Sequence, residues 1–242
     1  MNGALDAGGV TTLLCDADGT LFPSEEPAYA ASADVTNRLL ADLGADRPYA
    51  PDELQRMTNG KNFRAAAEEL ATDHPGDLSR AELEGWVAEE KDVVTAHLRS
   101  VLQPDPEVRQ PLLGLADRFT LAVVTSSASS RLAACLEVTG LAPLFDPDRR
   151  FSAEDSLAEP TSKPDPAVYV HAGRALGVGP AEAVAVEDSV NGARSAVAAG
   201  YPTIGILQFV PEADRQARAE ALREVGVAEV VESWADAEGL LR

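Results

Sequence analysis

Short apolar segments rich in β-branched residues alternate with segments of helical periodicity along most of the chain. Short apolar segments of this kind, bounded by glycine, proline or charged residues, are typical of buried strands. The pattern predicts strands at residues 10–15, 119–125, 183–187, 203–206 and 229–231.

Helical periodicity follows these strands. Apolar residues spaced three and four apart predict one helix through Leu112 and Leu115, one that ends near Gly140, and others over 166–176 and 190–199. A helix also follows each of the last two strands. Strands that alternate with helices favour an α/β fold in which a parallel sheet is wound on both faces.

The long segment after the first strand breaks this alternation, because its pattern predicts helices only. A capping box at Ser79 and Glu82 opens the last of them. We therefore expect a doubly wound catalytic core at 1–22 and 104–242 and an inserted, all-helical cap domain at 23–103.

The composition is that of a globular protein with a strongly acidic surface. Apolar residues make up 45% of the 242, and no apolar run approaches the length that spans a membrane. Forty acidic against twenty basic residues give a formal net charge of −20, which repels nucleic acids and anionic membranes. A small phosphorylated substrate is compatible with this charge, because screening beyond a Debye length of about 8 Å leaves local groups to decide. Since no secretory signal is visible, we expect a cytoplasmic protein.

Two carboxylates follow the first predicted strand, in the sequence CDADG. Because side chains alternate along a strand, Asp16 and Asp18 project to the same side if the extended path continues. Two carboxylates held this close repel each other unless a cation or a shared proton lies between them. The alternative is an ordinary Asp-Gly turn with solvated acids.

Polar groups also follow two further strands. Thr125, Ser126 and Ser127 place hydroxyls beside the free N–H groups of a new helix, which makes an anion site. Glu187 and Asp188 follow another strand. In an open parallel sheet, ligands bind beyond the carboxyl ends of the strands, so these positions indicate a binding site. Taken singly, the hydroxyls are also typical of helix caps, and the acids of a first helical turn.

A lysine in the sequence SKPDP adds a positive charge. Lys163 precedes a proline, which biases its backbone to an extended form, and Asp165 followed by Pro166 is typical of a helix start. The lysine is thus presented beside a helix N-terminus. The alternative is a solvated surface side chain.

Acids that hold a divalent cation, hydroxyl and N–H groups that hold an anion, and one fixed positive charge together indicate a phosphoryl-transfer site. One aspartate attacks phosphorus and forms an aspartyl-phosphate, while the other gives a proton to the leaving oxygen and later takes one from water. Ligands that are all oxygen favour Mg²⁺ over zinc.

These segments resemble the four motifs of the haloacid dehalogenase superfamily of aspartate-nucleophile phosphotransferases. The sequence CDADGTL matches the first motif, Thr125 in VVTSS the second, Lys163 in SKPDP the third and VEDSVNG the fourth. The resemblance covers nearly the whole chain. It implies a Rossmann-like core with a helical cap between the first two strands, as in the subgroup of phosphoglycolate phosphatases and β-phosphoglucomutases.

The resemblance also implies a role for each motif residue. The catalytic residues are Asp16, the nucleophile, and Asp18, the general acid and base. An aspartate as the second acid argues against a dehalogenase, which does not need it. The phosphate-binding residues are Thr125 and Lys163, with Ser126 beside them in the predicted anion site. The expected Mg²⁺ ligands are Asp16, the Asp18 carbonyl, Asp188 and Glu187, the last either directly or through water.

The predicted cap contributes a glycine turn that enters a helix, in the sequence MTNGKNFR. In similar proteins this region contacts the substrate. The expected substrate residues here are Gly60, Lys61, Asn62 and Arg64. The alternative is a solvated helix start.

The expected function is that of a Mg²⁺-dependent phosphatase for a small phosphorylated metabolite such as a sugar phosphate, in a monomer or weak homodimer. The nearest alternative is a β-phosphoglucomutase-like isomerase. Mutases of this family are similar in carrying a histidine at the hinge into the cap, where residues 25–30 hold none, so we expect water to receive the phosphoryl group. A phosphonate hydrolase would need a desolvated Lys61 to form a Schiff base. A signalling receiver module would lack the inserted cap.

Overall fold

The computed structural model describes residues 8–58 and 63–242, and the chain divides into two compact units. The sheet unit comprises Met1–Pro23 and Leu102–Arg242, and the helical unit is Ser24–Val101. Within the described ranges, no helix is long and apolar enough to cross a membrane. The protein therefore has an α/β, Rossmann-like core that is interrupted by a helical insertion.

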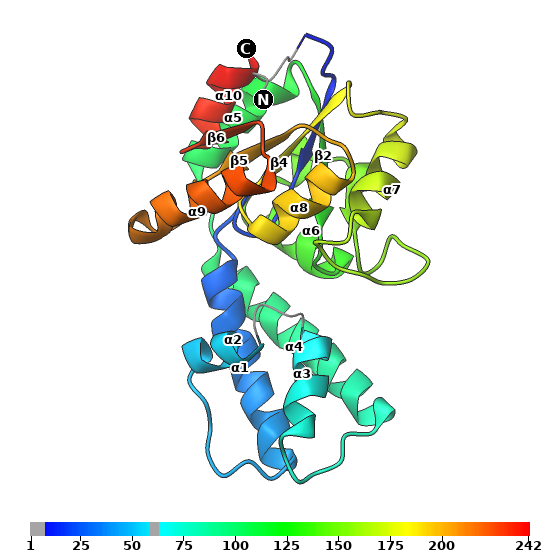
Figure 1. The fold of residues 1–242 in the computed structure, drawn as a ribbon, viewed down its shortest axis with the longest axis vertical. Coiled ribbons are helices and arrows are strands. Elements are labelled where there is room, and N and C mark those ends of the chain that lie inside the picture. The colour runs from blue at the N-terminus through cyan, green and yellow to red at the C-terminus, as the bar shows by residue number, and fades with distance from the viewer. Residues whose placement is uncertain (1–7, 59–62) are drawn as a thin grey trace. The chain divides into compact units, whose positions relative to one another are not determined.

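The strands of the described chain form one parallel sheet, in the order β3-β2-β1-β4-β5-β6 (Figure 1). β1 lies inside the sheet, and Cys15 at its end pairs with Val123 of β2 and Val186 of β4. This register brings the carboxyl ends of these three strands to one edge of the sheet. The bounds are β1 Thr12–Cys15, β2 Thr120–Thr125, β3 Arg150–Ser152, β4 Ala183–Glu187, β5 Thr203–Ile206 and β6 Glu229–Val231.

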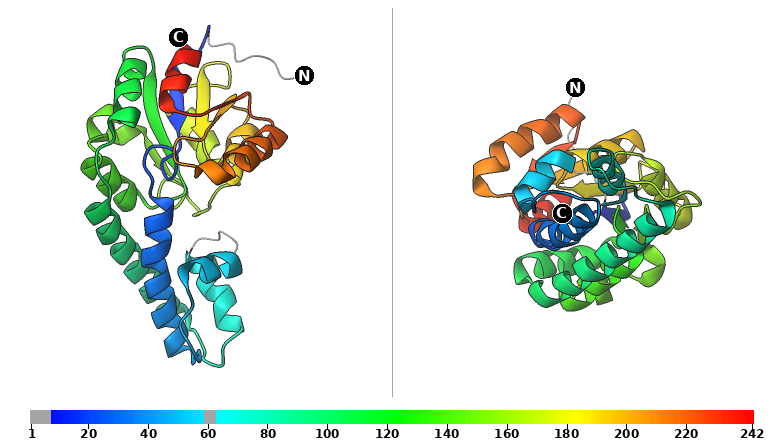
Figure 2. Two further views of the ribbon diagram at one scale, coloured as in Figure 1. Left: turned by 90° about the vertical axis from the view of Figure 1, so that its left-hand side faces the viewer. Right: turned by 90° about the horizontal axis from the view of Figure 1, so that it is seen from below.

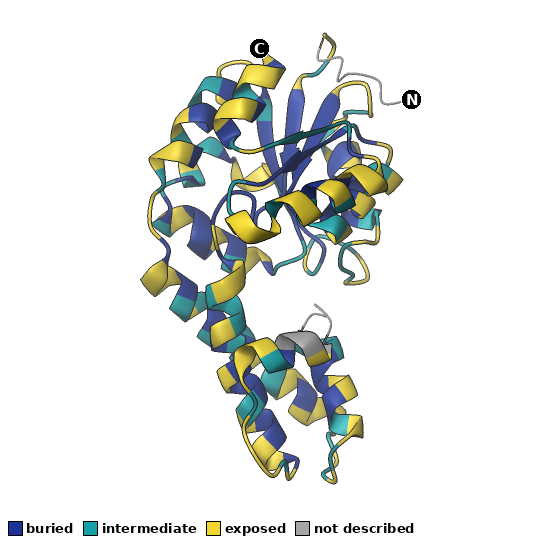
Figure 3. Cartoon of the chain, turned by 60° about the vertical axis from the view of Figure 1, so that its left-hand side comes forward, coloured by how far each residue is buried: buried dark blue, intermediate teal, exposed yellow. Residues whose placement is uncertain are grey.

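Burial explains why the inner strands have continuous apolar sequences. Every residue of β1, β4 and β5 is buried, and these inner strands are accordingly dark blue in Figure 3. A parallel sheet covered by helices on both faces removes both sides of each strand from water, so the alternation of apolar and polar residues is lost.

Helices of the sheet unit pack on these strands and on one another. α7 contacts β2 and β3, α8 contacts β4 and β5, and α10 contacts α5. α8 and α9 lie in front of the sheet in Figure 1, and the pair α5 and α10 can be followed in Figure 2. The bounds are α5 Pro106–Ala116, α6 Ser129–Val138, α7 Ala167–Leu176, α8 Val190–Ala198, α9 Glu212–Val225 and α10 Trp234–Leu241, with 3₁₀ turns at Ala142–Leu144 and Pro147–Arg149.

The helix start after Lys163 is close to the one predicted. The Asp165 carboxylate accepts a 2.8 Å hydrogen bond from the N–H of Ala167, as a capping aspartate does. α7 begins at Ala167, one residue later than predicted, because Pro166 takes the cap position. The loop that carries Lys163 is thereby tied to the beginning of α7.

The helical unit contains α1 Glu25–Asp42, α2 Pro51–Thr58, α3 Phe63–Thr72 and α4 Arg80–Val101. Leu39, Ala67 and Leu83 pack together in one of its apolar clusters. The capping box is confirmed: the Ser79 N–H donates to Glu82 Oε2 at 2.9 Å, and the Glu82 N–H donates to Ser79 Oγ at 3.3 Å. α4 begins at Arg80, directly after Ser79, and Glu82 lies in its first turn.

Two elements were absent from the predicted pattern. β3 is a strand of three residues, Arg150–Ser152, that pairs only with β2 among the described strands, and no strand was predicted between residues 125 and 183. α2, at Pro51–Thr58, has eight residues and a largely polar sequence. Both are too short to produce a recognisable hydrophobic period, so contacts with neighbouring elements decide their structure: β2 for β3, and α1 and α3 for α2.

Candidate active site

Four predicted site residues meet at the carboxyl edge of the sheet. Asp16 follows β1, Thr125 ends β2, Glu187 ends β4, and Asp188 comes next in the chain. The Asp16 N–H donates to the Val186 carbonyl at 2.9 Å, so the β1–β4 pairing continues to this residue. The sheet register thus fixes the backbone positions of these polar groups.

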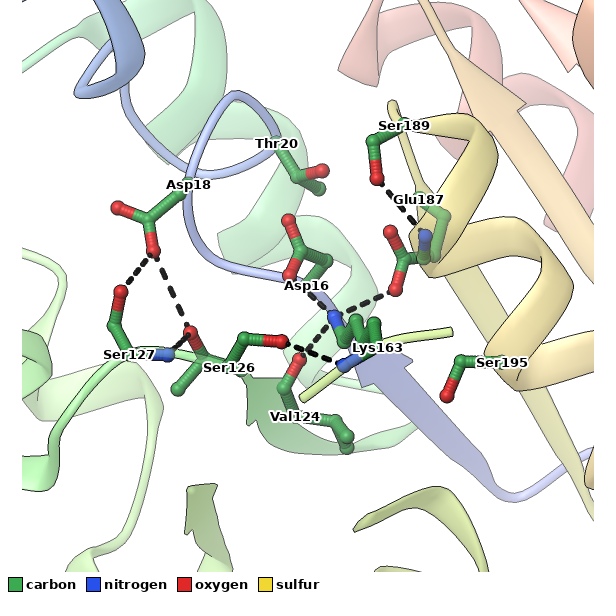
Figure 4. A network of polar contacts seen from close by, with 12 residues as sticks. Asp16, Asp18, Thr20, Val124, Ser126, Ser127, Lys163, Glu187, Ser189 and Ser195 are labelled. Carbon is green, nitrogen blue, oxygen red and sulfur yellow. Dashed lines mark hydrogen bonds and ion pairs between the residues drawn. The ribbon is translucent and has the colours of Figure 1, made fainter. Parts of the chain in front are cut away.

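Lys163 lies between two of the acids (Figure 4). Its Nζ donates to Asp16 Oδ1 at 2.5 Å and to Glu187 Oε1 at 2.6 Å, and also to the Val124 carbonyl at 2.8 Å. The Lys163 N–H donates to Ser126 Oγ at 3.1 Å, which ties the lysine loop to the end of β2. With 6% of its side chain exposed, Lys163 is not the solvated surface lysine of the alternative interpretation.

Burial and charge act together on the pKa values of this group. Burial raises the pKa of Asp16 and of Glu187, and the Lys163 ammonium opposes the rise. Burial also tends to lower the pKa of Lys163, but the two carboxylates outweigh it and hold that pKa above its usual value. The lysine therefore keeps its positive charge against Asp16.

Asp18 has different partners from Asp16. Its Oδ2 accepts a 2.8 Å hydrogen bond from Ser127 Oγ, with Thr125 Oγ1 at 3.4 Å. Thr125 Oγ1 in turn accepts the Ser127 N–H at 3.0 Å. Asp16 is buried and Asp18 is half-buried. The two aspartates of the first motif therefore stand in distinct surroundings, one beside an ammonium and one beside hydroxyls.

Three acids of the site could hold a cation. Asp16, Glu187 and Asp188 each offer a carboxylate oxygen, and these atoms lie within 4.8 Å of one another. Asp188 is 2% exposed, and its Oδ1 accepts a 2.9 Å hydrogen bond from Thr20 Oγ1. A set of buried carboxylate oxygens fits a hard cation such as Mg²⁺. Lys163 donates to Asp16 Oδ1 and to Glu187 Oε1, and the Tyr169 hydroxyl also donates to Glu187 Oε1, so one oxygen of each of these two carboxylates already has a hydrogen-bond donor.

Gly19 allows Asp188 to approach the first motif. Its φ is +81°, a conformation that residues with a Cβ rarely adopt, and a Cβ there would lie 2.5 Å from Asp188 Oδ2. The glycine of the DG pair is thus required twice, by the turn and by the carboxylate.

A comparison with known families tests the resemblance drawn from the four motifs. A model of the haloacid dehalogenase-like hydrolases matches residues 10–200, which include all the acids, hydroxyls and the lysine described above. The chain belongs to the haloacid dehalogenase-like hydrolases. The resemblance predicted from the four motifs is therefore confirmed, and the protein is an enzyme of this hydrolase family.

Individual relatives of this hydrolase fit the expected subgroup. The chain is 30% identical over 200 residues to protein CbbY of Rhodobacter capsulatus, and the match covers 79% of this chain and 83% of that protein. It is 30% identical over 199 residues to a phosphoglycolate phosphatase of Psychrobacter arcticus, covering 80% and 82%. Among solved structures, a haloacid dehalogenase-like protein of Agrobacterium tumefaciens matches with a TM-score of 0.69 at 27% identity, over 96% of this chain and 98% of that one.

The structure also brings in residues that were not predicted as site residues. Ser127 donates a hydrogen bond to Asp18. The only indication of this in the sequence was its hydroxyl, directly after those of Thr125 and Ser126. Thr20 donates a hydrogen bond to Asp188, and the sequence could have indicated a site role for it only through its position directly after Asp18 and Gly19. Tyr169 contacts Glu187 from within a helix, where its sequence is that of a packing residue.

The C-terminal part of the chain, beyond the family match, reaches the site as well. Arg218 of α9 donates to the Asp188 carbonyl at 2.8 Å and lies 3.6 Å from Asp188 Oδ2. The indole N–H of Trp234, at the start of α10, donates to the Thr20 carbonyl at 2.8 Å. Both contacts support the loop and acid that line the proposed cation site.

The predicted cap residues have a different outcome. Gly60, Lys61 and Asn62 lie outside the described residues. Arg64 forms a two-pronged ion pair with Glu84, with N–O distances of 2.7 and 2.8 Å, and so joins α3 to α4 within the helical unit. Its role toward substrate stays a prediction.

Proposed function

We propose that this hydrolase is a Mg²⁺-dependent phosphatase that removes the phosphoryl group of a small phosphorylated metabolite, such as a sugar phosphate, through an aspartyl-phosphate. The observation that carries the proposal is the buried Lys163 ammonium, 2.5 Å from Asp16 Oδ1. A phosphoryl group brought to Asp16 meets a fixed positive charge at the point of attack. Fixed charges of this kind stabilise a transferring phosphoryl group most when the site is desolvated.

In the first step, a carboxylate oxygen of Asp16 attacks phosphorus, and the bond from phosphorus to the leaving oxygen breaks. Asp18 gives its proton to that oxygen. In the second step, Asp18 takes a proton from water, the water oxygen attacks phosphorus, and the bond to Asp16 breaks. The products are the dephosphorylated metabolite and inorganic phosphate, and both aspartates return to their initial state.

Binding and orientation come from the edge of β2 and from the lysine loop. Thr125, Ser126 and Lys163 are the proposed ligands of the phosphoryl oxygens. The Thr125 hydroxyl lies 3.4 Å from Asp18 Oδ2, the Lys163 ammonium lies 2.5 Å from Asp16 Oδ1, and Ser126 Oγ accepts the Lys163 N–H. Ser127 holds Asp18 by a 2.8 Å hydrogen bond. Asp18 therefore has a defined position from which to exchange protons.

The proposed Mg²⁺ ligands are Asp16, Asp188 and the Asp18 carbonyl, with Glu187 acting directly or through water. When bound, Mg²⁺ neutralises charge on the phosphoryl oxygens. Arg218 and Thr20 hold Asp188 in place for this role.

The substrate class rests on the relatives and on the site together. A relative that is 30% identical is named as a phosphoglycolate phosphatase. Phosphoglycolate is a small phosphorylated acid. The proposed cap residues Lys61, Asn62 and Arg64 would contact the remainder of the substrate.

The proposal is tested by phosphate release from a panel of small phosphorylated metabolites in the presence of Mg²⁺. We expect turnover by the wild type, loss of turnover in Asp16→Asn with an unchanged unfolding temperature, and wild-type turnover in Asp34→Asn, whose side chain is exposed on α1.

Incubation with β-glucose 1-phosphate and a trace of bisphosphate distinguishes the phosphatase from the mutase alternative. Rapid glucose 6-phosphate formation with little free phosphate would contradict the proposal.

A further inference from the structure

Tyr169 is a fully buried residue of α7 whose hydroxyl is directed at the site. It belongs to the apolar cluster that also contains Leu14, Val124 and Val168. Within these apolar surroundings its hydroxyl donates a 2.6 Å hydrogen bond to Glu187 Oε1. A phenylalanine would fill the same volume, so packing alone does not account for the hydroxyl.

The carboxylate of Glu187 is held on both sides. Its Oε1 accepts hydrogen bonds from Lys163 Nζ and from the Tyr169 hydroxyl, each at 2.6 Å. Its Oε2 lies against α8, where a Cβ on Gly192 would be 1.7 Å away, and it has no hydrogen-bond partner among the described residues. The Tyr169 hydroxyl is therefore one of two donors that fix where Oε1 lies.

Tyr169 also contacts the lysine that Glu187 binds. Lys163 Nζ lies 5.2 Å from the centre of the Tyr169 ring, within the range of a cation–π contact. The same Nζ donates to Asp16 Oδ1 at 2.5 Å. A single tyrosine thus touches both the ammonium that faces Asp16 and the carboxylate that balances it.

We propose that Tyr169 is a positioning residue that fixes Glu187 and, through it, holds the Lys163 ammonium where the phosphoryl group binds. The inference rests on the proposed function, because it assigns Lys163 to phosphate. Without the hydroxyl, Glu187 Oε1 loses one of its two donors, and the carboxylate and the ammonium are free to shift together. Hydrogen bonds to charged groups are among the stronger ones, so the expected loss of phosphate affinity is about 10-fold.

Tyr201 offers a matched control. It belongs to the same apolar cluster, its ring centre lies 6.3 Å from that of Tyr169, and its hydroxyl donates to the Val178 carbonyl at 3.3 Å. Tyr201→Phe therefore removes a hydroxyl from the same region but not from Glu187.

The test is the dissociation constant of inorganic phosphate, measured by titration calorimetry in Mg²⁺ for the wild type, Tyr169→Phe and Tyr201→Phe. This constant does not depend on turnover or on the fraction of folded enzyme. For Tyr169→Phe we expect phosphate binding about 10-fold weaker than in the wild type, and a higher KM for the substrate. For Tyr201→Phe we expect wild-type values of both. Equal phosphate affinity in Tyr169→Phe and the wild type would overturn the inference, as would an equal loss in both variants.

A coupling measurement shows whether Tyr169 acts through Lys163. In a Lys163→Met background, Tyr169→Phe should cause no further loss of phosphate affinity, because the group that it positions is gone. An undiminished second loss would contradict the inference, and so would a Tyr169→Phe protein that fails to fold, since the hydroxyl would then hold the fold. Failure of the proposed function has a separate signature: a wild type that binds phosphate but turns over no metabolite.

Discussion

Asp18 accepts a 2.8 Å hydrogen bond from Ser127 Oγ, whereas Asp16, two residues earlier, accepts one of 2.5 Å from the Lys163 ammonium. Two aspartates on the same short loop thus have partners of different charge. The Lys163 ammonium opposes the rise in pKa that burial gives Asp16, and so favours the ionised form that the proposed nucleophile needs. A neutral hydroxyl beside Asp18 can serve either protonation state, as an acid and base needs.

Replacing Ser127 by alanine should lower kcat by about 10-fold, since Asp18 loses one hydrogen bond of roughly 1.5 kcal/mol. Ser130→Ala, at an exposed position of α6, is the control and should keep wild-type kcat. Steady-state phosphate release measures both. A Ser127→Ala enzyme as fast as the control would mean that Asp18 needs no such support.

Gly19→Ala should weaken Mg²⁺ binding as well as the fold, because the new Cβ would lie 2.5 Å from Asp188 Oδ2. Gly140→Ala separates the two effects. Gly140 also has a positive φ, +70°, but among the described residues nothing lies within 4 Å of a Cβ there. We expect a loss of about 1–2 kcal/mol in the free energy of unfolding from backbone strain alone in Gly140→Ala. Only Gly19→Ala should also lose Mg²⁺ affinity in a calorimetric titration, and equal Mg²⁺ affinity in both variants would count against this role.

Gly192→Ala should lower both activity and stability, although alanine is the better helix former. Its Cβ would lie 1.7 Å from Glu187 Oε2, so the carboxylate must leave Lys163 and Tyr169. Gly85→Ala in α4, with open space at the Cβ among the described residues, should instead stabilise the protein by about 0.5–1 kcal/mol. Thermal unfolding and kcat of the two variants check this. The prediction is wrong if Gly192→Ala is the more stable of the two or is fully active.

Removing the metal should abolish turnover and lower the unfolding temperature. At a Mg²⁺ concentration of 100 times Kd, binding to the native state alone stabilises it by about 2.7 kcal/mol. Asp188→Asn should lose most of this stabilisation, whereas Asp148→Asn, at an exposed 3₁₀ turn, should retain it. Unfolding curves with Mg²⁺ and with EDTA provide the measurement. A wild type that is equally active and equally stable in EDTA would exclude the proposed metal role.

Local sequence pattern was enough to predict five of the six strands in the described chain, together with the polar residues that follow β1, β2 and β4. The strand at Ala183–Glu187 has the bounds that its apolar run predicts, and a parallel register necessarily brings Glu187 to the same edge as Asp16. Lys163 was predicted from its motif, yet its burial and its shared contact with two acids were not, because they depend on how the loop before α7 folds back over the sheet.

The supporting residues could not be predicted, for a physical reason. Tyr169, Arg218 and Trp234 reach the site from helices and not from strand ends, and each looks locally like an ordinary core or surface residue. Their positions follow from the packing of α7, α9 and α10, which no periodicity specifies. The three residues of β3 are a similar case, since pairing with β2 rather than propensity makes them a strand.

The central claim is that Asp16 carries the phosphoryl group during turnover. The most direct measurement is to mix the Asp18→Asn enzyme with p-nitrophenyl phosphate, whose leaving group needs no proton, and to quench within milliseconds. Reduction with borohydride converts an aspartyl-phosphate to homoserine, which peptide mass spectrometry can locate. Homoserine at position 16, absent from the Asp16→Asn protein, is the predicted result. Release of p-nitrophenol by the enzyme with position 16 remaining aspartate throughout would contradict the account.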